Sequence, residues 1–172
     1  MVSVEYCQLL ARYNRWMNER LYALLAGLTD DERKRDRGAF FASMHGTLNH
    51  LLWGDRMWLG RFIDEPCTAK AFGADMFGDF AELARERETT DRKVQDWAGK
   101  TTASWLAGTL RYTSKVDRRT RELPRALAAM QLFNHGTHDR GQLTTLLRQA
   151  GRDPGPTDIP WLPGVVRFVD AP

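Results

Sequence analysis

The sequence contains little cysteine and no long apolar run. Only Cys7 and Cys67 occur among its 172 residues, far apart and in no CxxC spacing. This pattern excludes a disulfide scaffold and a zinc ribbon, and it favours reduced, structural thiols in a reducing compartment. No apolar segment reaches the roughly 18 residues that a membrane span needs, and no signal-peptide pattern opens the chain. We therefore expect a cytoplasmic protein with no membrane partner.

A large excess of one sign of charge is also missing. The 25 basic and 22 acidic residues leave a net charge of +3, and the basic clusters at 33–35 and 118–119 are short. Charge runs of this length are usually solvated faces, so we expect no nucleic-acid partner. The hydrophobic fraction of 42% and the length are typical of one folded domain, here residues 1–172.

Apolar residues recur every three or four positions in four segments, which predicts amphipathic helices. The expected helices span residues 4–28, 40–63, 80–98 and 124–150. Proline, two glycines and weak periodicity in residues 64–78 predict a long connection that lets the chain cross the bundle. Residues 106–112 and 120–123 flank a polar stretch and indicate a small β-hairpin before the last helix, although no Asn-Gly or Asp-Gly turn marks it.

The histidines gather in two short windows. They are His45 and His50, then His135 and His138. At about 100° per helical residue, Asp139 lies roughly 40° from His135 and His138 roughly 60° on the other side, so either can share a cation with His135. The i,i+4 spacing is the one that zinc-protease helices use, which favours Asp139. His45 lies about 140° from His50 and is expected outside the ligand set.

We therefore predict a metal site formed by His50, His135 and Asp139. Two imidazoles and one carboxylate can hold zinc with an open fourth position, and the same donors form the facial triad of non-haem iron. A histidine on an apolar helix is more often a hydrogen-bonded core residue, so a structural role is the competing interpretation. Gly46 and Gly54 lie one turn on either side of His50, which favours close approach of a helix, ligand or substrate.

Three further side chains have expected partners. Asp55 is an acid on the most apolar helix and needs a partner such as an arginine. Gln142 falls close to the His135 stripe, where it is expected to orient a ligand or a bound water. Trp161 is expected to pack an extended C-terminal tail onto the helices.

Residues 13–21, 49–58 and 134–147 resemble, in the same order, the motifs of the DinB/YfiT-like proteins. The likeness spans nearly the whole chain. It implies an all-α fold, a four-helix bundle with a long crossover between the second and third helices, often assembled as a homodimer. It also implies a divalent metal held by one histidine of the second helix and an HxxxH pair of the fourth.

By position, His50 and His135 match two of the family's ligands. Asp139 occupies the third position: the family motif reads His-His-Arg-Gly-Gln, and this chain reads His-Asp-Arg-Gly-Gln at residues 138–142. Three outcomes are open: a two-histidine, one-carboxylate site, recruitment of His138 in place of Asp139, or weakened metal binding.

Relatives of this fold include thiol-dependent transferases and metal-dependent hydrolases. We therefore expect a divalent-metal-dependent enzyme of one of these two types, in which zinc, nickel, iron or manganese activates a bound water or thiol. The alternative is a non-catalytic metal- or ligand-binding stress-response dimer. The sequence assigns neither the small-molecule substrate nor the metal, and it assigns no catalytic residue.

Overall fold

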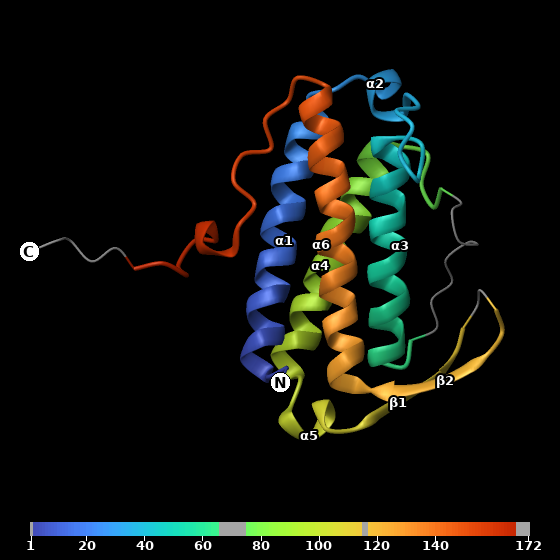
Figure 1. The fold of residues 1–172 in the computed structure, drawn as a ribbon, viewed down its shortest axis with the longest axis vertical. Helices are drawn as coiled ribbons and strands as arrows, with labels where there is room; N and C mark the ends of the chain where they lie inside the picture. Colours follow the sequence, from blue (N-terminus) through green and yellow to red (C-terminus); the bar gives the residue numbers. More distant parts are fainter. Residues whose placement is uncertain (1, 66–74, 115–116, 168–172) are drawn as a thin grey trace, which may run out of the picture.

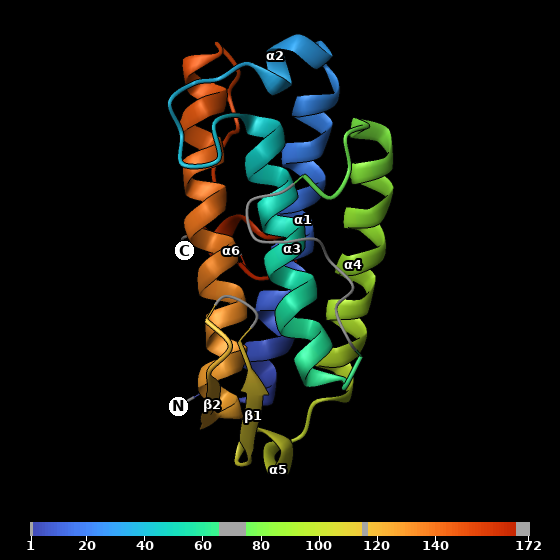
Figure 2. The ribbon, with the colours of Figure 1, turned by 90° about the vertical axis from the view of Figure 1, so that its right-hand side faces the viewer.

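Four long helices form most of the structure, a computed structural model that describes residues 2–65, 75–114 and 117–167. The helices run side by side (Figures 1 and 2) and are α1 (Val4–Ala26), α3 (Met44–Phe62), α4 (Phe80–Lys100) and α6 (Arg125–Gln149). Helix α1 packs against α4, and α3 packs against α6. The four expected helices are thus confirmed in place. No helix in the described ranges has the length and apolar character that a membrane crossing requires.

Side-chain caps set where three of these helices begin. The side chains of Ser3, Ser43 and Asp79 each accept a hydrogen bond from a backbone N–H in the first turn that follows. The prediction that the second long helix begins at Phe40 was wrong. Residues 39–42 form a tight loop in which Ala42 has a φ of 59°, and Ser43 then caps α3.

The charged stretch after α1 is partly helical. Helix α2 (Asp30–Lys34) begins with a capping box in which Thr29 and Glu32 satisfy each other's backbone N–H groups. The connection expected at 64–78 leads from the end of α3 to α4, and its residues 66–74, with Cys67, lie outside the described residues.

The expected hairpin is confirmed. Strands β1 (Thr109–Thr113) and β2 (Thr120–Pro124) pair antiparallel, after the short helix α5 (Ala103–Leu106). Tyr112 on β1 packs edge-to-face on Trp58 of α3, and the guanidinium of Arg61 lies 3.9 Å from the Tyr112 ring centroid. These contacts hold the hairpin against the lower end of α3.

The prediction that Trp161 anchors the C-terminal tail was wrong. The short 3-10 turn η1 (Ile159–Trp161) leaves the Trp161 side chain 63% exposed, whereas Leu162 is 5% exposed and packs in the core. Helix α1 holds the tail from outside: Tyr13 donates to the carbonyl of Thr157, and Arg20 donates to those of the prolines at 154 and 156.

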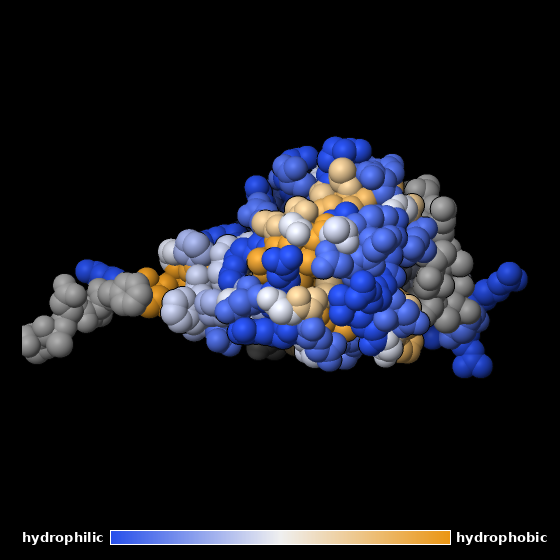
Figure 3. All heavy atoms as spheres, turned by 90° about the horizontal axis from the view of Figure 1, so that it is seen from above, coloured by the Kyte–Doolittle hydropathy of each residue, from blue (hydrophilic) through white to orange (hydrophobic). Residues whose placement is uncertain are grey.

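The core consists of two apolar clusters with a layer of polar side chains between them along the helices. We define this buried polar layer by its members: Asn14, Asn18, Asp55, Arg87, Asp91 and Arg140. On α1, for example, Cys7 and Ala11 belong to one cluster and Leu21 and Leu25 to the other, with the two asparagines between them. Seen from above, the end of the molecule is mostly hydrophilic, with apolar residues near its middle (Figure 3).

Candidate metal centre

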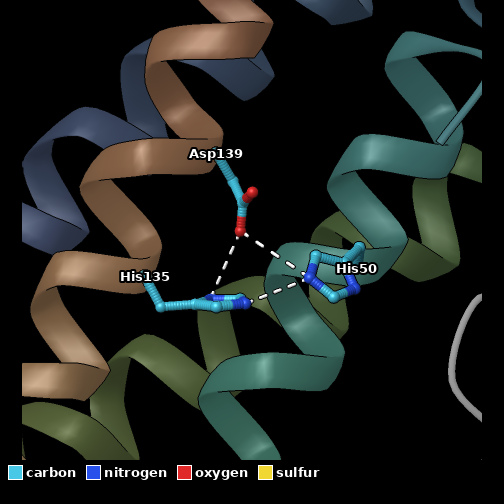
Figure 4. A group of neighbouring side chains, drawn as sticks. All are labelled: His50, His135 and Asp139. Atoms are coloured by element: carbon cyan, nitrogen blue, oxygen red, sulfur yellow. Dashed lines mark hydrogen bonds and ion pairs between the residues drawn. The ribbon is translucent and has the colours of Figure 1, made fainter. Parts of the chain in front are cut away.

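Three potential ligands converge between α3 and α6. His50 comes from α3, His135 and Asp139 come from α6, and their side chains point toward one another (Figure 4). The Nε2 atoms of His50 and His135 lie 3.0 Å apart, and Asp139 Oδ2 lies 3.8 Å from His50 Nε2 and 3.3 Å from His135 Nδ1. One donor atom from each residue lies within 4.8 Å of the others. These are the three residues that helical spacing selected.

Two glycines of α3 make this convergence possible. A Cβ on Gly54 would lie 2.8 Å from His135 Nδ1, so only glycine lets the imidazole settle against α3. Gly46 gives way to the backbone carbonyl of Phe41 in the same manner. The Phe41 ring then stacks on the His50 imidazole, with ring centroids 3.8 Å apart and an interplanar angle of 19°. Both glycines therefore serve close approach, as the sequence indicated.

Burial controls the protonation of the site. His50 is 8% exposed and Asp139 is 3% exposed. Burial, with a smaller contribution from the neighbouring His135, lowers the pKa of His50 to about 4. Burial also raises the pKa of Asp139, and the nearby His135 and His138 oppose that shift. Because imidazole binds a metal through a lone pair, the neutral His50 at pH 7 is ready to act as a ligand.

The donor set and its spacing fit a divalent cation. Ligand bonds of roughly 2.1 Å in a tetrahedral arrangement place donor atoms about 3.4 Å apart. The measured separations of 3.0, 3.3 and 3.8 Å lie on both sides of that value. Within the described part of the chain, the buried Asp139 Oδ2 accepts no hydrogen bond despite its closeness to His135. A buried carboxylate oxygen of this kind is a group that a cation would satisfy.

The other two histidines lie outside the group. His45 is buried and its Nε2 lies 2.9 Å from the carbonyl oxygen of Phe77, in line with the expectation that it does not share the ligand sphere. His138 is exposed, and its Nε2 lies 2.8 Å from Nε2 of Gln142. The structure therefore brings Asp139, rather than His138, to His50. Gln142 contacts His138 rather than any of the three converging residues.

The buried polar layer lies directly behind these residues. Asp55 follows Gly54 and pairs with Arg87 at 2.8 Å, and Arg87 also pairs with Asp91 at 2.9 Å. The arginine partner expected for Asp55 is thus confirmed as Arg87. The stacked Phe41 and the polar layer were not predicted: Phe41 was assigned to a helix, and nothing local to α1 indicates which residues its buried asparagines meet.

Comparison with known proteins agrees with the fold and the motifs. The sequence profile of the DinB family matches residues 1–165. Protein DinB of Bacillus subtilis (strain 168) is 24% identical over 152 residues, which cover 87% of this chain and 88% of that protein. The crystal structure of a DinB-like protein from Bacillus cereus ATCC 10987 aligns with a TM-score of 0.60 and 19% identity, over 88% of this chain and 91% of that one. The chain belongs to the DinB family.

Proposed function

We propose that this protein is a divalent-metal-dependent enzyme whose cation is held by His50, His135 and Asp139. The observation that carries the proposal is the convergence of three suitable donor atoms from two helices within 4.8 Å. Three protein ligands leave coordination positions for water or substrate, which is the pattern of catalytic rather than structural sites.

A bound divalent cation supplies Lewis acidity, which lowers the pKa of a coordinated water or thiol and makes it nucleophilic near neutral pH. The chain's own groups prepare for this role. The carboxylate of Asp139 offsets part of the cation's charge, the neutral imidazole of His50 offers its lone pair, and the ring of Phe41 covers one face of that imidazole. Thiol transfer to an electrophile and hydrolysis both use such a nucleophile, so both are candidate reactions.

A structural role for the histidines is the competing interpretation, and one observation favours it. The 3.0 Å separation of the two Nε2 atoms is also that of a hydrogen bond between neutral imidazoles. In that case the protein would be a non-catalytic ligand-binding stress-response protein. The two interpretations differ in whether the purified protein holds metal.

Metal content measured by elemental mass spectrometry on untagged protein separates them. We expect near-stoichiometric zinc, nickel, iron or manganese in the parent, loss of that metal in His50→Ala, His135→Ala and Asp139→Ala, and retention in the control His138→Ala. Thiol transfer and hydrolysis would then be screened with the loaded protein. A parent that stays metal-free after reconstitution with all four metals would refute the proposal.

The finer fold assignment and the assembly belong to the same proposal. We assign the four long helices to the four-helix bundle class, since they run side by side around one core. We also propose a homodimer formed through the outer face of α6. Its exposed residues between Arg125 and Arg148 are all uncharged, namely Leu127, Met130, Asn134, Thr137, His138, Gly141 and Thr145.

A two-fold interface sets the same residues of two copies against each other, so a face without charge meets its copy without repulsion. Charged residues are also depleted from interface cores. By contrast, most exposed residues of α4 are charged. Light scattering after gel filtration should give the mass of a dimer for the parent and of a monomer for Leu127→Arg. A monomeric parent at micromolar concentration would contradict this assignment.

A further inference from the structure

The buried polar layer crosses the molecule at the level of the proposed metal centre. All four long helices contribute to it, and Asn14, Arg87 and Arg140 are each at most 3% exposed. On α3 the layer residue Asp55 lies five positions after His50, and on α6 Arg140 follows Asp139 directly. The layer therefore contacts both helices that carry the converging donors.

Asn14 is the member of the layer that bonds to both of those helices. Its Nδ2 lies 3.4 Å from Asp55 Oδ2 on α3, at the outer limit of a hydrogen bond, and 3.2 Å from Asp91 Oδ1 on α4. Its Oδ1 accepts a hydrogen bond from Nη1 of Arg140 on α6. One amide of α1 thus joins the two helices of the metal centre from behind.

The other layer contacts do not make this connection. Arg87 links α3 to α4 through Asp55 and Asp91. Asn18, one turn after Asn14 on α1, donates only to Asp91. Among the described residues, the link from Asp55 to Arg140 within the layer therefore passes through Asn14.

Gly136 leaves the room that this link needs. A Cβ at that position would lie 2.9 Å from Arg140 Nη1 and 3.1 Å from Asn14 Oδ1. A methyl group there would press on the hydrogen bond between the two side chains. The glycine lies one residue after His135, so sequence has combined a ligand position and the clearance for this contact in a single turn of α6.

We propose that Asn14 is a positioning residue for the metal centre. By bonding to Asp55 and Arg140, it fixes how α6 sits against α3, and hence the separation of His50 from His135 and Asp139. Its amide touches none of the three donors, so it acts on metal affinity only through the helices. The inference rests on the proposed metal function.

The first test compares Asn14→Ala with Asn18→Ala. Both remove a buried amide from α1 and a hydrogen bond to Asp91, so both should lower the melting temperature. Groups behind metal ligands typically affect affinity about 10- to 100-fold. We expect Co²⁺ binding, followed by its visible ligand-field absorption, to weaken at least about tenfold in Asn14→Ala and to stay within about threefold of the parent in Asn18→Ala.

A second pair keeps the inference testable if Asn14→Ala does not fold. Gly136→Ala should disturb the same contact while retaining every hydrogen-bonding group, and Gly99→Ala, on α4 with open space around its Cβ, is the control. Weaker Co²⁺ binding or an altered absorption spectrum in Gly136→Ala alone, with native helical circular dichroism, would support the inference.

The outcomes separate the two proposals. A parent protein that binds no Co²⁺ would overturn the metal function and the role of Asn14 with it. A parent that binds Co²⁺, with equal affinities in Asn14→Ala and Asn18→Ala, or with no effect of Gly136→Ala, would overturn the positioning role alone.

Discussion

The imidazole of His135 rests against the bare backbone of Gly54, across the contact between α6 and α3. A Cβ on Gly54 would lie 2.8 Å from Nδ1 and 3.2 Å from Nε2 of that ring. An interior helical glycine is less stable than alanine by roughly 0.5–1 kcal/mol. That local cost is offset by a close approach of the two helices that carry the converging donors.

Gly54→Ala should therefore separate helix stability from metal binding. The added methyl group improves helix propensity but displaces the His135 ring, so we expect metal affinity to fall at least about tenfold while helical circular dichroism is unchanged. Gly99→Ala gains the same propensity in open space and should bind metal as the parent does. Unchanged affinity in Gly54→Ala, measured by competition with a chelator, would show that His135 is not a ligand.

The stacked ring of Phe41 keeps His50 out of water, and burial is the largest cause of the lowered pKa of His50. Removing the ring in Phe41→Ala should therefore raise this pKa from about 4 toward the ordinary value of 6.5. Its neighbour Phe40 is 77% exposed, so Phe40→Ala should leave the pKa unchanged. NMR titration of the metal-free proteins measures both. A pKa near 6.5 in the parent would refute the stated effect of burial.

Periodicity was enough to predict the long helices and the donors they carry, because the positions of His135 and Asp139 on α6 follow from local geometry. Facing His50 across the contact was predictable once both helices were assigned. Phe41 was not, because its ring reaches His50 only through a loop that depends on the left-handed Ala42 and the Ser43 cap. The role of Asn14 was also hidden, since polar residues on an amphipathic helix are usually expected at its surface.

Cys7 should be unreactive in the folded protein. Its side chain is fully buried, and burial raises the pKa of its thiol to about 11, so little thiolate forms below pH 9. In a Cys67→Ser variant, which leaves Cys7 as the single thiol, we expect no reaction with a disulfide reagent at pH 8 until denaturant is added. Rapid labelling of the native variant would mean that the α1 end of the core opens readily.

The C-terminal tail should depend on Leu162 rather than on the larger Trp161. Leu162 is 5% exposed within the apolar cluster that contains Tyr13, whereas Trp161 is 63% exposed. Leu162→Ala should lower the free energy of unfolding by about 2 kcal/mol or more, and Trp161→Ala should change it by less than about 0.5 kcal/mol. Urea denaturation of both variants provides the measurement. A larger loss in Trp161→Ala would indicate that the indole contacts a partner or a second copy.

Two arginines of α4 show how strongly burial determines the value of an ion pair. Arg87 is 2% exposed and pairs with Asp55 and Asp91, while the side chain of Arg92 is 52% exposed and pairs with Glu88. Arg87→Met leaves two buried carboxylates without their cation, so the free energy of unfolding should fall by about 3–5 kcal/mol. Arg92→Met removes a solvated i,i+4 pair and should cost at most about 0.5 kcal/mol. The loss in Arg87→Met should also shrink as pH is lowered, because protonation of Asp55 or Asp91 removes the unbalanced charge. A loss in Arg87→Met that is small at neutral pH would mean that solvent reaches the polar layer, and the α1 amides would then have little hold on the helices of the metal centre.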